Sequence, residues 1–300
     1  GESGDSSLVR LEHTDNVTNK FIDLNNVAGF TFKDVSFAFY SDNTSNVYNF
    51  SGCDTLRMIS CHFNSQYSYH RILIRACNGV LLENNANLPS VDISNISSNS
   101  TYRLLNNTNI YTFTLYNGSS DSSINMTLLN NTFQSSEPYI SLSSNNKSDT
   151  IVFSGNSFSN IYSANFQSSD HDMVVFKDNI VNVSIDQWNN NWEYAPLFVN
   201  ADSILRNTIV GRLRFESGSP YVAQNRFLKH SYGNYTSLEL SQCSPTVINN
   251  YVVVGGLLDS KGIYLNNCQA NTFVAHNSIS NVGSTLTSYG LYVNSDIDNL

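Results

Sequence analysis

The sequence predicts an all-β fold, a single parallel β-solenoid of about eleven coils with three short strands in each coil. The first observation is a repeated unit, in which alternating apolar residues lead into an Asn, one spacer residue and a large apolar residue that we call the anchor. The second is the spacing of the anchors, which runs from 18 to 29 residues. Self-similarity at a period of roughly 20–50 residues is typical of solenoids. The third is that the apolar runs are short, rich in β-branched and aromatic residues, and bounded by Asn, Ser, Gly and Asp, which favours strands over helices.

The clearest copy of the unit is the stretch from Ser244 to Tyr251. Similar endings are Asn131-Thr132-Phe133, Asn156-Ser157-Phe158, Asn207-Thr208-Ile209, Asn225-Arg226-Phe227, Asn271-Thr272-Phe273 and Asn277-Ser278-Ile279, with Cys61-His62-Phe63 as a variant. One anchor per coil is predicted at Phe37, Phe63, Leu88, Ile110, Phe133, Phe158, Ile180, Ile209, Phe227, Tyr251 and Ile279. An Asn at a fixed turn position can bond to the Asn of the next coil, and Asn also tolerates a left-handed backbone. The spacing therefore predicts an Asn ladder, although the chain contains 44 Asn residues and abundance alone would produce some copies.

These coil endings, which extend from about Phe21 to the last residue, resemble those of the right-handed parallel β-helix superfamily of the pectin-lyase-like type. The resemblance implies a right-handed solenoid. It does not imply one activity, because that superfamily includes lyases, hydrolases, phage tailspikes, adhesins and surface-layer proteins, and a fold does not determine a function.

In chain order, residues 1–20 are a polar segment or a first coil, with residues 8–11 as a candidate strand. Residues 21–300 are predicted to form one β-helix domain, and the pattern allows this domain to continue beyond the chain end. The register is hard to follow between residues 90 and 150, where Asn and Ser dominate, and it returns at Thr150. The widest step, from Ile180 to Ile209, contains both tryptophans of the chain.

The composition excludes some partners and favours others. A net charge of −9 with only 15 Lys and Arg residues argues against nucleic acid, which needs a basic face, and against anionic membranes. No segment is long and apolar enough to insert directly into a membrane. Few charges together with abundant Asn, Ser, Thr and Tyr are typical of secreted and cell-surface proteins, so we expect an extracellular location.

The five cysteines are spaced by about one coil. Cys53 and Cys77 are 24 residues apart, and Cys243 and Cys268 are 25 residues apart, so each pair is predicted to stack at one register. Thiols fill small apolar slots well, and strands about 4.8 Å apart also satisfy the Cα separation of a disulfide. Stacked free thiols and disulfides both fit this spacing, and Cys61 remains unpaired in either case. No Cys or His spacing suggests a zinc site.

The segment around the two tryptophans is the best candidate for a glycan-binding site, because aromatic rings stack on sugars and carboxylates bind hydroxyl groups. The candidates are Asp186, Trp188, Trp192, Glu193 and Tyr194, with Arg212 and Arg214 from the next coils. The alternative is that a long turn folds its aromatic side chains over the core for packing.

Twelve Asn-x-Ser/Thr sequons are candidate N-glycosylation sites, a number barely above the roughly nine that chance would give. They are Asn16, Asn43, Asn49, Asn95, Asn99, Asn106, Asn117, Asn125, Asn130, Asn146, Asn182 and Asn234.

The regular coils and scattered titratable groups favour an extracellular structural or adhesive surface protein, built as a β-helix rod. The alternative is a carbohydrate-active enzyme, a polysaccharide lyase or a glycoside hydrolase. The sequence lacks the paired Asp, Gly-His-Gly and Arg-Ile-Lys motifs of the superfamily's polygalacturonases, so the catalytic residues are unknown. We expect no cofactor and no metal. Only under the lyase alternative would calcium bind, with Asp170, Asp172 and Asp178 as ligands and Arg212 as the base.

The two ends of the repeat carry no visible capping helix or charge cluster. An uncovered coil presents unpaired backbone groups that invite another chain. The sequence therefore predicts either a continuing column or end-to-end self-association into a filament or surface layer.

Overall fold

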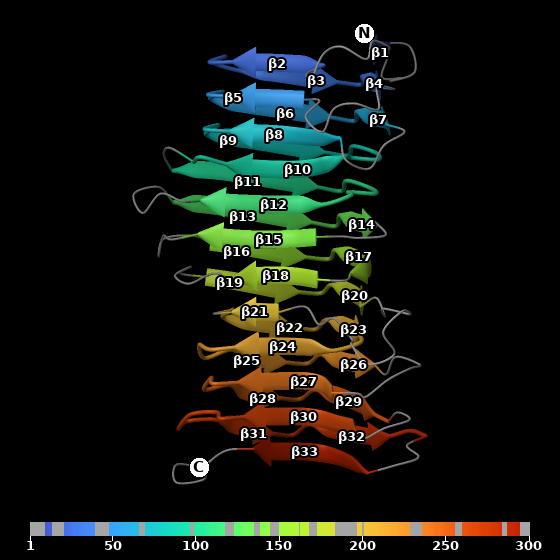
Figure 1. Cartoon of the computed structure of the whole chain (residues 1–300), viewed down its shortest axis with the longest axis vertical. Helices are drawn as coiled ribbons and strands as arrows, with labels where there is room; N and C mark the ends of the chain where they lie inside the picture. The colour runs from blue at the N-terminus through green and yellow to red at the C-terminus, as the bar shows by residue number, and fades with distance from the viewer. Residues whose placement is uncertain are drawn as a thin grey trace. The chain divides into compact units, whose positions relative to one another are not determined.

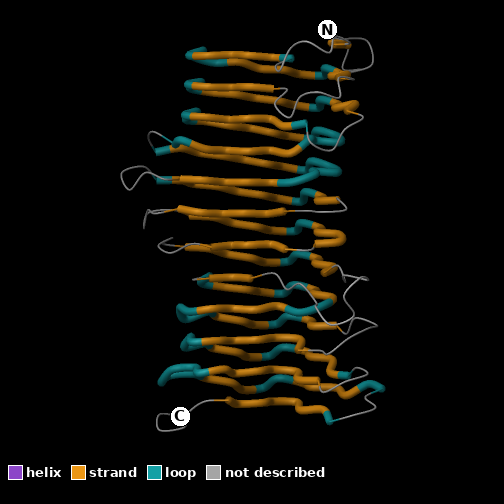
Figure 2. Tube along the Cα trace, in the orientation of Figure 1, coloured by secondary structure: helices purple, strands orange, loops and turns teal. Residues whose placement is uncertain are grey.

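The computed structural model describes residues 10–13, 21–39, 48–65, 70–96, 99–117, 123–134, 139–144, 150–161, 163–167, 173–183, 197–199, 201–228, 236–255, 260–283 and 287–294. Within these ranges the regular structure is β-strand and no helix is present, so none is available to cross a membrane (Figure 2). The chain divides into unit 1, which comprises Gly1–Ser135, Ile140–Val152 and Asp170–Asp172, and unit 2, which comprises Ser136–Tyr139, Phe153–Ser169 and Met173–Leu300.

Each unit is a right-handed parallel β-solenoid, in which a coil runs through strands on three faces and each strand pairs in parallel with the equivalent strand of the next coil (Figure 1). We call face 1 the face that contains β2 and β5, face 2 the face that contains β3 and β6, and face 3 the face that contains β4 and β7. The predicted all-β solenoid with short strands is confirmed. The coil count differs somewhat from the predicted eleven.

In unit 1, face 1 contains β2 (Ile22–Asn25), β5 (Tyr48–Ser51), β8 (Arg71–Arg75), β10 (Ser90–Ser94), β12 (Phe113–Asn117) and β15 (Tyr139–Ser144), whose first residue belongs to unit 2. Face 2 contains β3 (Phe30–Lys33), β6 (Thr55–Ile59), β9 (Gly79–Glu83), β11 (Ser100–Leu105), β13 (Ile124–Leu129) and β16 (Thr150–Ser154), whose last two residues belong to unit 2. Face 3 contains β1 (Arg10–His13), β4 (Ser36–Phe39), β7 (His62–Ser65) and β14 (Thr132–Gln134). Single β-bridges at Ala86, Thr108 and Ile110 continue face 3 between β7 and β14.

In unit 2, face 1 contains β18 (Ser163–Gln167), β21 (Leu197–Val199), β24 (Leu213–Glu216), β27 (Thr236–Ser241), β30 (Ser260–Asn266) and β33 (Ser288–Asn294). Face 2 contains β19 (Met173–Lys177), β22 (Ser203–Leu205), β25 (Tyr221–Ala223), β28 (Thr246–Ile248) and β31 (Phe273–Ala275). Face 3 contains β17 (Ser157–Ile161), β20 (Ile180–Val183), β23 (Thr208–Val210), β26 (Arg226–Leu228), β29 (Tyr251–Val254) and β32 (Ser278–Asn281).

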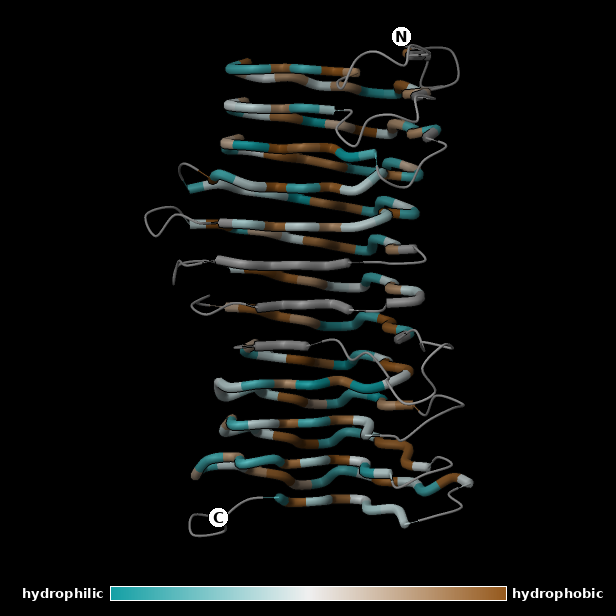
Figure 3. Tube along the Cα trace, viewed as in Figure 1, coloured by the Kyte–Doolittle hydropathy of each residue, from teal (hydrophilic) through white to brown (hydrophobic). Residues whose placement is uncertain are grey.

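The core of each unit follows from the alternation along the strands, where successive side chains point to opposite faces of the sheet. In β13, Ile124, Met126 and Leu128 are buried while Asn125 between them is exposed. Figure 3 shows hydrophobic and hydrophilic stretches along the strands of both units. Stacking of equivalent positions brings like side chains together, so the Phe37 and Phe63 rings in unit 1 lie 5.0 Å apart at 24°.

The turn between faces 2 and 3 of unit 1 holds the predicted Asn ladder. Its first residue has a positive φ, as at Asn84 (φ 55°), and the next residue is buried, as at Asn85. The Nδ2 atom of Asn85 donates to Oδ1 of Asn107 at 2.9 Å, and Asn107 donates in the same way to Asn131 at 2.9 Å. The two properties predicted for one Asn, a left-handed backbone and a stacked amide, therefore belong to two successive residues. Cys61 takes the ladder position of its coil, and its backbone N–H donates to Oδ1 of Asn85 at 2.9 Å.

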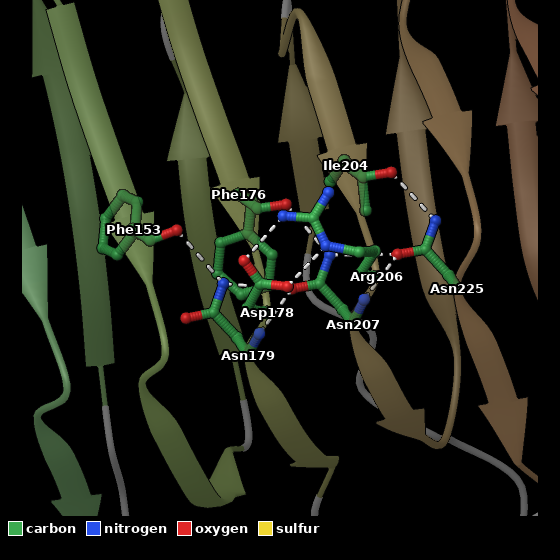
Figure 4. A network of polar contacts seen from close by, with 8 residues as sticks. All are labelled: Phe153, Phe176, Asp178, Asn179, Ile204, Arg206, Asn207 and Asn225. Atoms are coloured by element: carbon green, nitrogen blue, oxygen red, sulfur yellow. Dashed lines mark hydrogen bonds and ion pairs between the residues drawn. The ribbon is translucent and has the colours of Figure 1, made fainter.

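Unit 2 contains an equivalent ladder of buried amides (Figure 4). Each Nδ2 donates to Oδ1 of the next Asn at 2.9–3.0 Å, through Asn156, Asn179, Asn207, Asn225, Asn250 and Asn277. Each amide from Asn179 onward also donates to a backbone carbonyl of the preceding coil, as Asn225 does to Ile204 at 2.9 Å. The ladder satisfies polar groups that would otherwise be buried without partners.

Two anchor assignments were wrong. Ile180 and Tyr251 are 52% and 40% exposed, and the side chains that enter the core are those of Val181 and Val252, which are buried. The ending Asn271-Thr272-Phe273, to which no anchor was assigned, also departs from the repeated unit, because Phe273 is 55% exposed. A shift of one residue moves a side chain to the opposite face of a strand. In an apolar pair such as Tyr251-Val252, the sequence therefore does not show which of the two residues faces the core.

Candidate functional site

Four side chains line up on the outward side of face 1 in unit 2. Arg214 of β24, Glu239 of β27, Tyr264 of β30 and Tyr292 of β33 are register partners on successive strands. Each lies between two residues whose side chains point toward the core, so its own side chain points outward. Because neighbouring strands are about 4.8 Å apart, the four groups form a continuous column on a rigid sheet.

The first half of this column is ionic. Arg212 contacts Glu239 through Nη2 and Oε2, and the Nε atom of Arg214 lies 3.7 Å from the other oxygen of Glu239. Arg214 also pairs with Glu216. The side chain of Glu239 is only 7% exposed although it lies on the outward side, because the two guanidinium groups are close to it. The two cations and two carboxylates neutralise one another.

The two arginines retain unused hydrogen-bonding capacity. The Nε atoms of Arg212 and Arg214 are buried and lack a hydrogen-bond partner among the residues described. Their side chains remain 31% and 41% exposed. A ligand with hydroxyl or carboxylate oxygens can therefore contact the exposed parts of these side chains, whereas the buried Nε atoms are not open to it.

The second half of the column is aromatic. The ring centroids of Tyr264 and Tyr292 are 5.5 Å apart, and those of Tyr289 and Tyr292 are 5.0 Å apart. The Nζ atom of Lys261 lies 3.9 Å from the centroid of Tyr264 and 4.2 Å from that of Tyr292. Contacts of this kind hold a cation over a ring face and orient both groups.

A row of amide groups borders the tyrosines. The Nδ2 atom of Asn294 donates to Oδ1 of Asn266 at 3.0 Å, and Asn266 donates to Oγ of Ser241 at 3.2 Å. Asn294 also lies 3.4 Å from the Tyr264 hydroxyl. We call the ionic and aromatic groups together the outer-face patch, which comprises Arg212, Arg214, Glu216, Glu239, Lys261, Tyr264, Tyr289 and Tyr292.

The predicted glycan-binding residues fall into two groups. Arg212 and Arg214 are brought together in the outer-face patch. The other candidates, Asp186, Trp188, Trp192, Glu193 and Tyr194, lie outside the described residues. Sequence reasoning missed Glu239, Tyr264 and Tyr292, because they come from three other coils.

The lyase-type candidates are not brought together by any described contact. Asp170 and Asp172 lie outside the described residues. Asp178 binds both Nε and Nη2 of Arg206, at 2.7 and 2.8 Å (Figure 4). These hydrogen bonds lower the pKa of the Asp178 carboxyl below its usual range. Arg212 pairs instead with Glu239.

Within the described ranges, no three His, Cys, Asp or Glu side chains form a group that could hold a metal ion.

The sequons differ in exposure. Asn49 is buried in β5, and its Nδ2 donates to Oδ1 of Asp23 at 2.6 Å. The exposed sequon residues are Asn95, Asn99, Asn106, Asn125, Asn130 and Asn182. Asn117 is the last residue of β12, and only its backbone is described. Asn16, Asn43, Asn146 and Asn234 lie outside the described residues.

Comparisons of this chain with protein-family models, curated proteins and solved structures found no match.

Proposed function

We propose that this chain is an extracellular structural or adhesive protein of the pectin-lyase-like β-helix type, and that its outer-face patch binds glycans. The observation that carries the proposal is the register of Arg214, Glu239, Tyr264 and Tyr292 on four adjacent strands. This register places aromatic rings directly beside charged hydrogen-bonding groups on one rigid surface. A glycan needs both, since its apolar ring faces pack on aromatic side chains and its hydroxyl groups need polar partners.

The charges indicate the kind of glycan. Glu216 and Glu239 neutralise the two arginines, while Lys261 lies over tyrosine rings. The patch as a whole therefore carries one excess positive charge. A glycan with occasional carboxylates, such as a uronate-containing polymer, would place a carboxylate near Lys261 and neutral sugars against the tyrosines. Pairing of this carboxylate with Lys261 would fix the orientation of the bound glycan more than it would raise the affinity.

The test is retention of the purified full-length chain on a glycan array that includes neutral and uronate-containing polymers. Tyr264→Ala and Tyr292→Ala should each weaken retention by about ten-fold, because ~1.4 kcal/mol of lost ring contact corresponds to that factor. Tyr221→Ala is the matched control, since Tyr221 is 41% exposed on β25 of face 2. Equal retention by all three variants would overturn the assignment of the patch.

The enzyme alternative is distinguished in the same experiment. If the bound polymer loses length, with release of reducing ends or unsaturated products, the protein is a carbohydrate-active enzyme. In that case Arg212→Ala should abolish product release. Retention without any product supports adhesion.

The segment around the two tryptophans remains a separate prediction. Trp188→Ala combined with Trp192→Ala should weaken glycan retention if these rings extend the binding surface. A large fall in the thermal midpoint with unchanged retention would instead support the packing alternative.

We also propose that copies of the chain associate through the coil formed by β32 and β33. Core-facing positions Ile279, Leu291 and Val293 are 38%, 47% and 36% exposed there, whereas their register partners in β29 and β30 are buried. A coil from another copy would cover these side chains and pair with the β33 backbone, as a neighbouring strand does within the unit.

A further inference from the structure

We propose that Cys243 and Cys268 are an oxidation-sensitive dithiol, which a peroxide or a low-molecular-weight disulfide converts into a covalent bridge between two consecutive coils. The two thiols occupy the same position of their coils, two residues after the register partners Ser241 and Asn266. Their Sγ atoms are 3.9 Å apart, and both thiols are free.

The backbone geometry permits the bridge. Neighbouring parallel strands are about 4.8 Å apart, which is within the Cα separation of roughly 4.4–6.8 Å that disulfides show. The two turns are also fixed by backbone hydrogen bonds, from Gln242 N–H to the Asn266 carbonyl at 2.9 Å and from Gln269 N–H to the Cys243 carbonyl at 2.9 Å. A disulfide bond is about 2.05 Å long, so rotation of the side chains has to shorten the present separation by roughly 2 Å.

The two thiols differ in reactivity. Cys268 is half-buried, whereas Cys243 is buried. The hydrogen bond from Cys243 lowers the pKa of Cys268 to about 7. The same hydrogen bond, together with burial, raises the pKa of Cys243. At neutral pH about half of the accessible member of the pair is therefore thiolate, which is the nucleophilic form.

The reaction with hydrogen peroxide balances in two steps. The Cys268 thiolate attacks one peroxide oxygen, the O–O bond breaks, and Cys268 becomes a sulfenic acid while the departing hydroxide takes up a proton to form water. The Cys243 sulfur then attacks the sulfenic sulfur, the S–O bond breaks, and its thiol proton leaves with the hydroxide as a second water. The two sulfurs together lose two electrons, and the peroxide gains them.

The pair Cys53 and Cys77 provides an internal comparison. These thiols also lie at one register, two residues before the partners Thr55 and Gly79, but both are buried. Burial raises the pKa of Cys77 to about 12. The two pairs therefore share the coil spacing and differ in access and ionisation, so we expect only the pair in unit 2 to react in the folded protein.

The bridge lies beside the outer-face patch. Glu239 and Tyr264, which are register partners, each precede one of the two cysteines by four residues. Oxidation would hold β27 and β30 together at this point. It would also restrain the loop between them, which closes over a sequence separation of 25 residues.

The test uses the folded full-length chain, first reduced and then exposed to hydrogen peroxide or oxidised glutathione. After alkylation and proteolysis, mass spectrometry should find the Cys243–Cys268 peptide pair linked, with two hydrogens fewer than the reduced peptides. This link should form at least ten-fold faster than any link between Cys53 and Cys77. Its rate should rise with pH and reach half of its maximum near pH 7, where the Cys268 thiol ionises.

Variants separate the bridge from general oxidation. Cys268→Ser and Cys243→Ser should each abolish the link and the accompanying rise in thermal midpoint, while Cys53→Ser should leave both unchanged. The peptide map is measured on the wild-type protein, so it tests the link even if a variant fails to fold. Linkage of Cys53 to Cys77 at an equal rate, or a Cys268 adduct that persists in the wild-type protein without forming the link to Cys243, would overturn the proposal.

Discussion

The ladder Asn residues are the side chains whose surroundings in unit 2 are most completely specified. Asn225 donates to the Ile204 carbonyl and to Oδ1 of Asn250, and its own Oδ1 accepts from the backbone N–H and from Nδ2 of Asn207. Asn225→Ala removes all four bonds at a buried position. A buried polar group without a partner costs about 1–3 kcal/mol, so the variant should lose roughly 3–5 kcal/mol of stability. A fall in the urea midpoint measures the loss.

The control for Asn225→Ala is Asn182→Ala, since Asn182 is exposed on β20. Exposed substitutions of this kind usually change stability by no more than about 0.5 kcal/mol. If the two variants had the same midpoint, the buried amides would not stabilise the coils.

The spacing of Asn residues identified five of the stacked amides, but neither the remaining ones nor every side chain that faces the core. Asn131, Asn156, Asn207, Asn225 and Asn277 were identified because one polar residue recurs before an apolar one. The errors at Ile180 and Tyr251 have a physical cause. Each is followed by a valine, and both members of such a pair suit a strand, so only the pairing of neighbouring coils selects the one that turns inward.

At the scale of single strands, the end of β29 shows how closely two coils approach. Gly255 has φ +147°, and a Cβ added there would lie 2.1 Å from the Val282 carbonyl oxygen. Both the positive φ of Gly255 and the lack of space for a Cβ beside Val282 exclude a larger residue. Gly255→Ala should therefore lose about 2–4 kcal/mol, combining backbone strain with displacement of the neighbouring chain. Thermal unfolding and protection of the β29 and β32 amides from hydrogen exchange measure the effect.

Gly29→Ala is the matched control, because a Cβ at Gly29 meets nothing within 4 Å and its φ is not in the left-handed region. A compatible Gly→Ala change is neutral or stabilises by roughly 0.4–1 kcal/mol through the unfolded chain. Equal losses in the two variants would contradict the close approach of Gly255 to Val282.

The outer-face patch shows why the site was only partly predictable. Arg212 and Arg214 were found because they follow the tryptophan segment, whereas Glu239, Tyr264 and Tyr292 are separated from them in the chain. A usable signal was present in the triplets Leu213-Arg214-Phe215, Leu238-Glu239-Leu240, Ile263-Tyr264-Leu265 and Leu291-Tyr292-Val293. Each places one polar or aromatic residue between two apolar ones, and their alignment gives the column. The ion pairs and ring contacts depend on side-chain conformations that no sequence pattern specifies.

At the scale of the whole molecule, the two units use the same interactions in the core. They differ in the residue types found at the positive-φ position of the turns. In unit 1 the positive-φ position before the ladder is often Asn, as at Asn84, Asn106 and Asn130. In unit 2 the same position also holds Asp178, Arg206, Gln224 and His276. Residues other than Gly, Asn and Asp adopt this conformation at a cost of about 1–2 kcal/mol, which the ladder and core must offset. At two of these positions unit 2 therefore carries the paired charges of Asp178 and Arg206, where the three coils named for unit 1 carry amides.

Self-association is the property of the whole molecule that the exposed side chains of β32 and β33 predict. Ile279, Leu291 and Val293 occupy core-facing positions but remain exposed, so contact with another copy would remove apolar surface from water. Light scattering across a range of protein concentrations should show an average mass that rises above that of one chain. A charge at a core-facing position should prevent the contact without removing any buried group, so Leu291→Asp should return the mass to that of a monomer. Tyr221→Asp on face 2 is the control and should leave the association unchanged. A wild-type chain that stays monomeric at every concentration, or equal effects of the two substitutions, would exclude association through this coil.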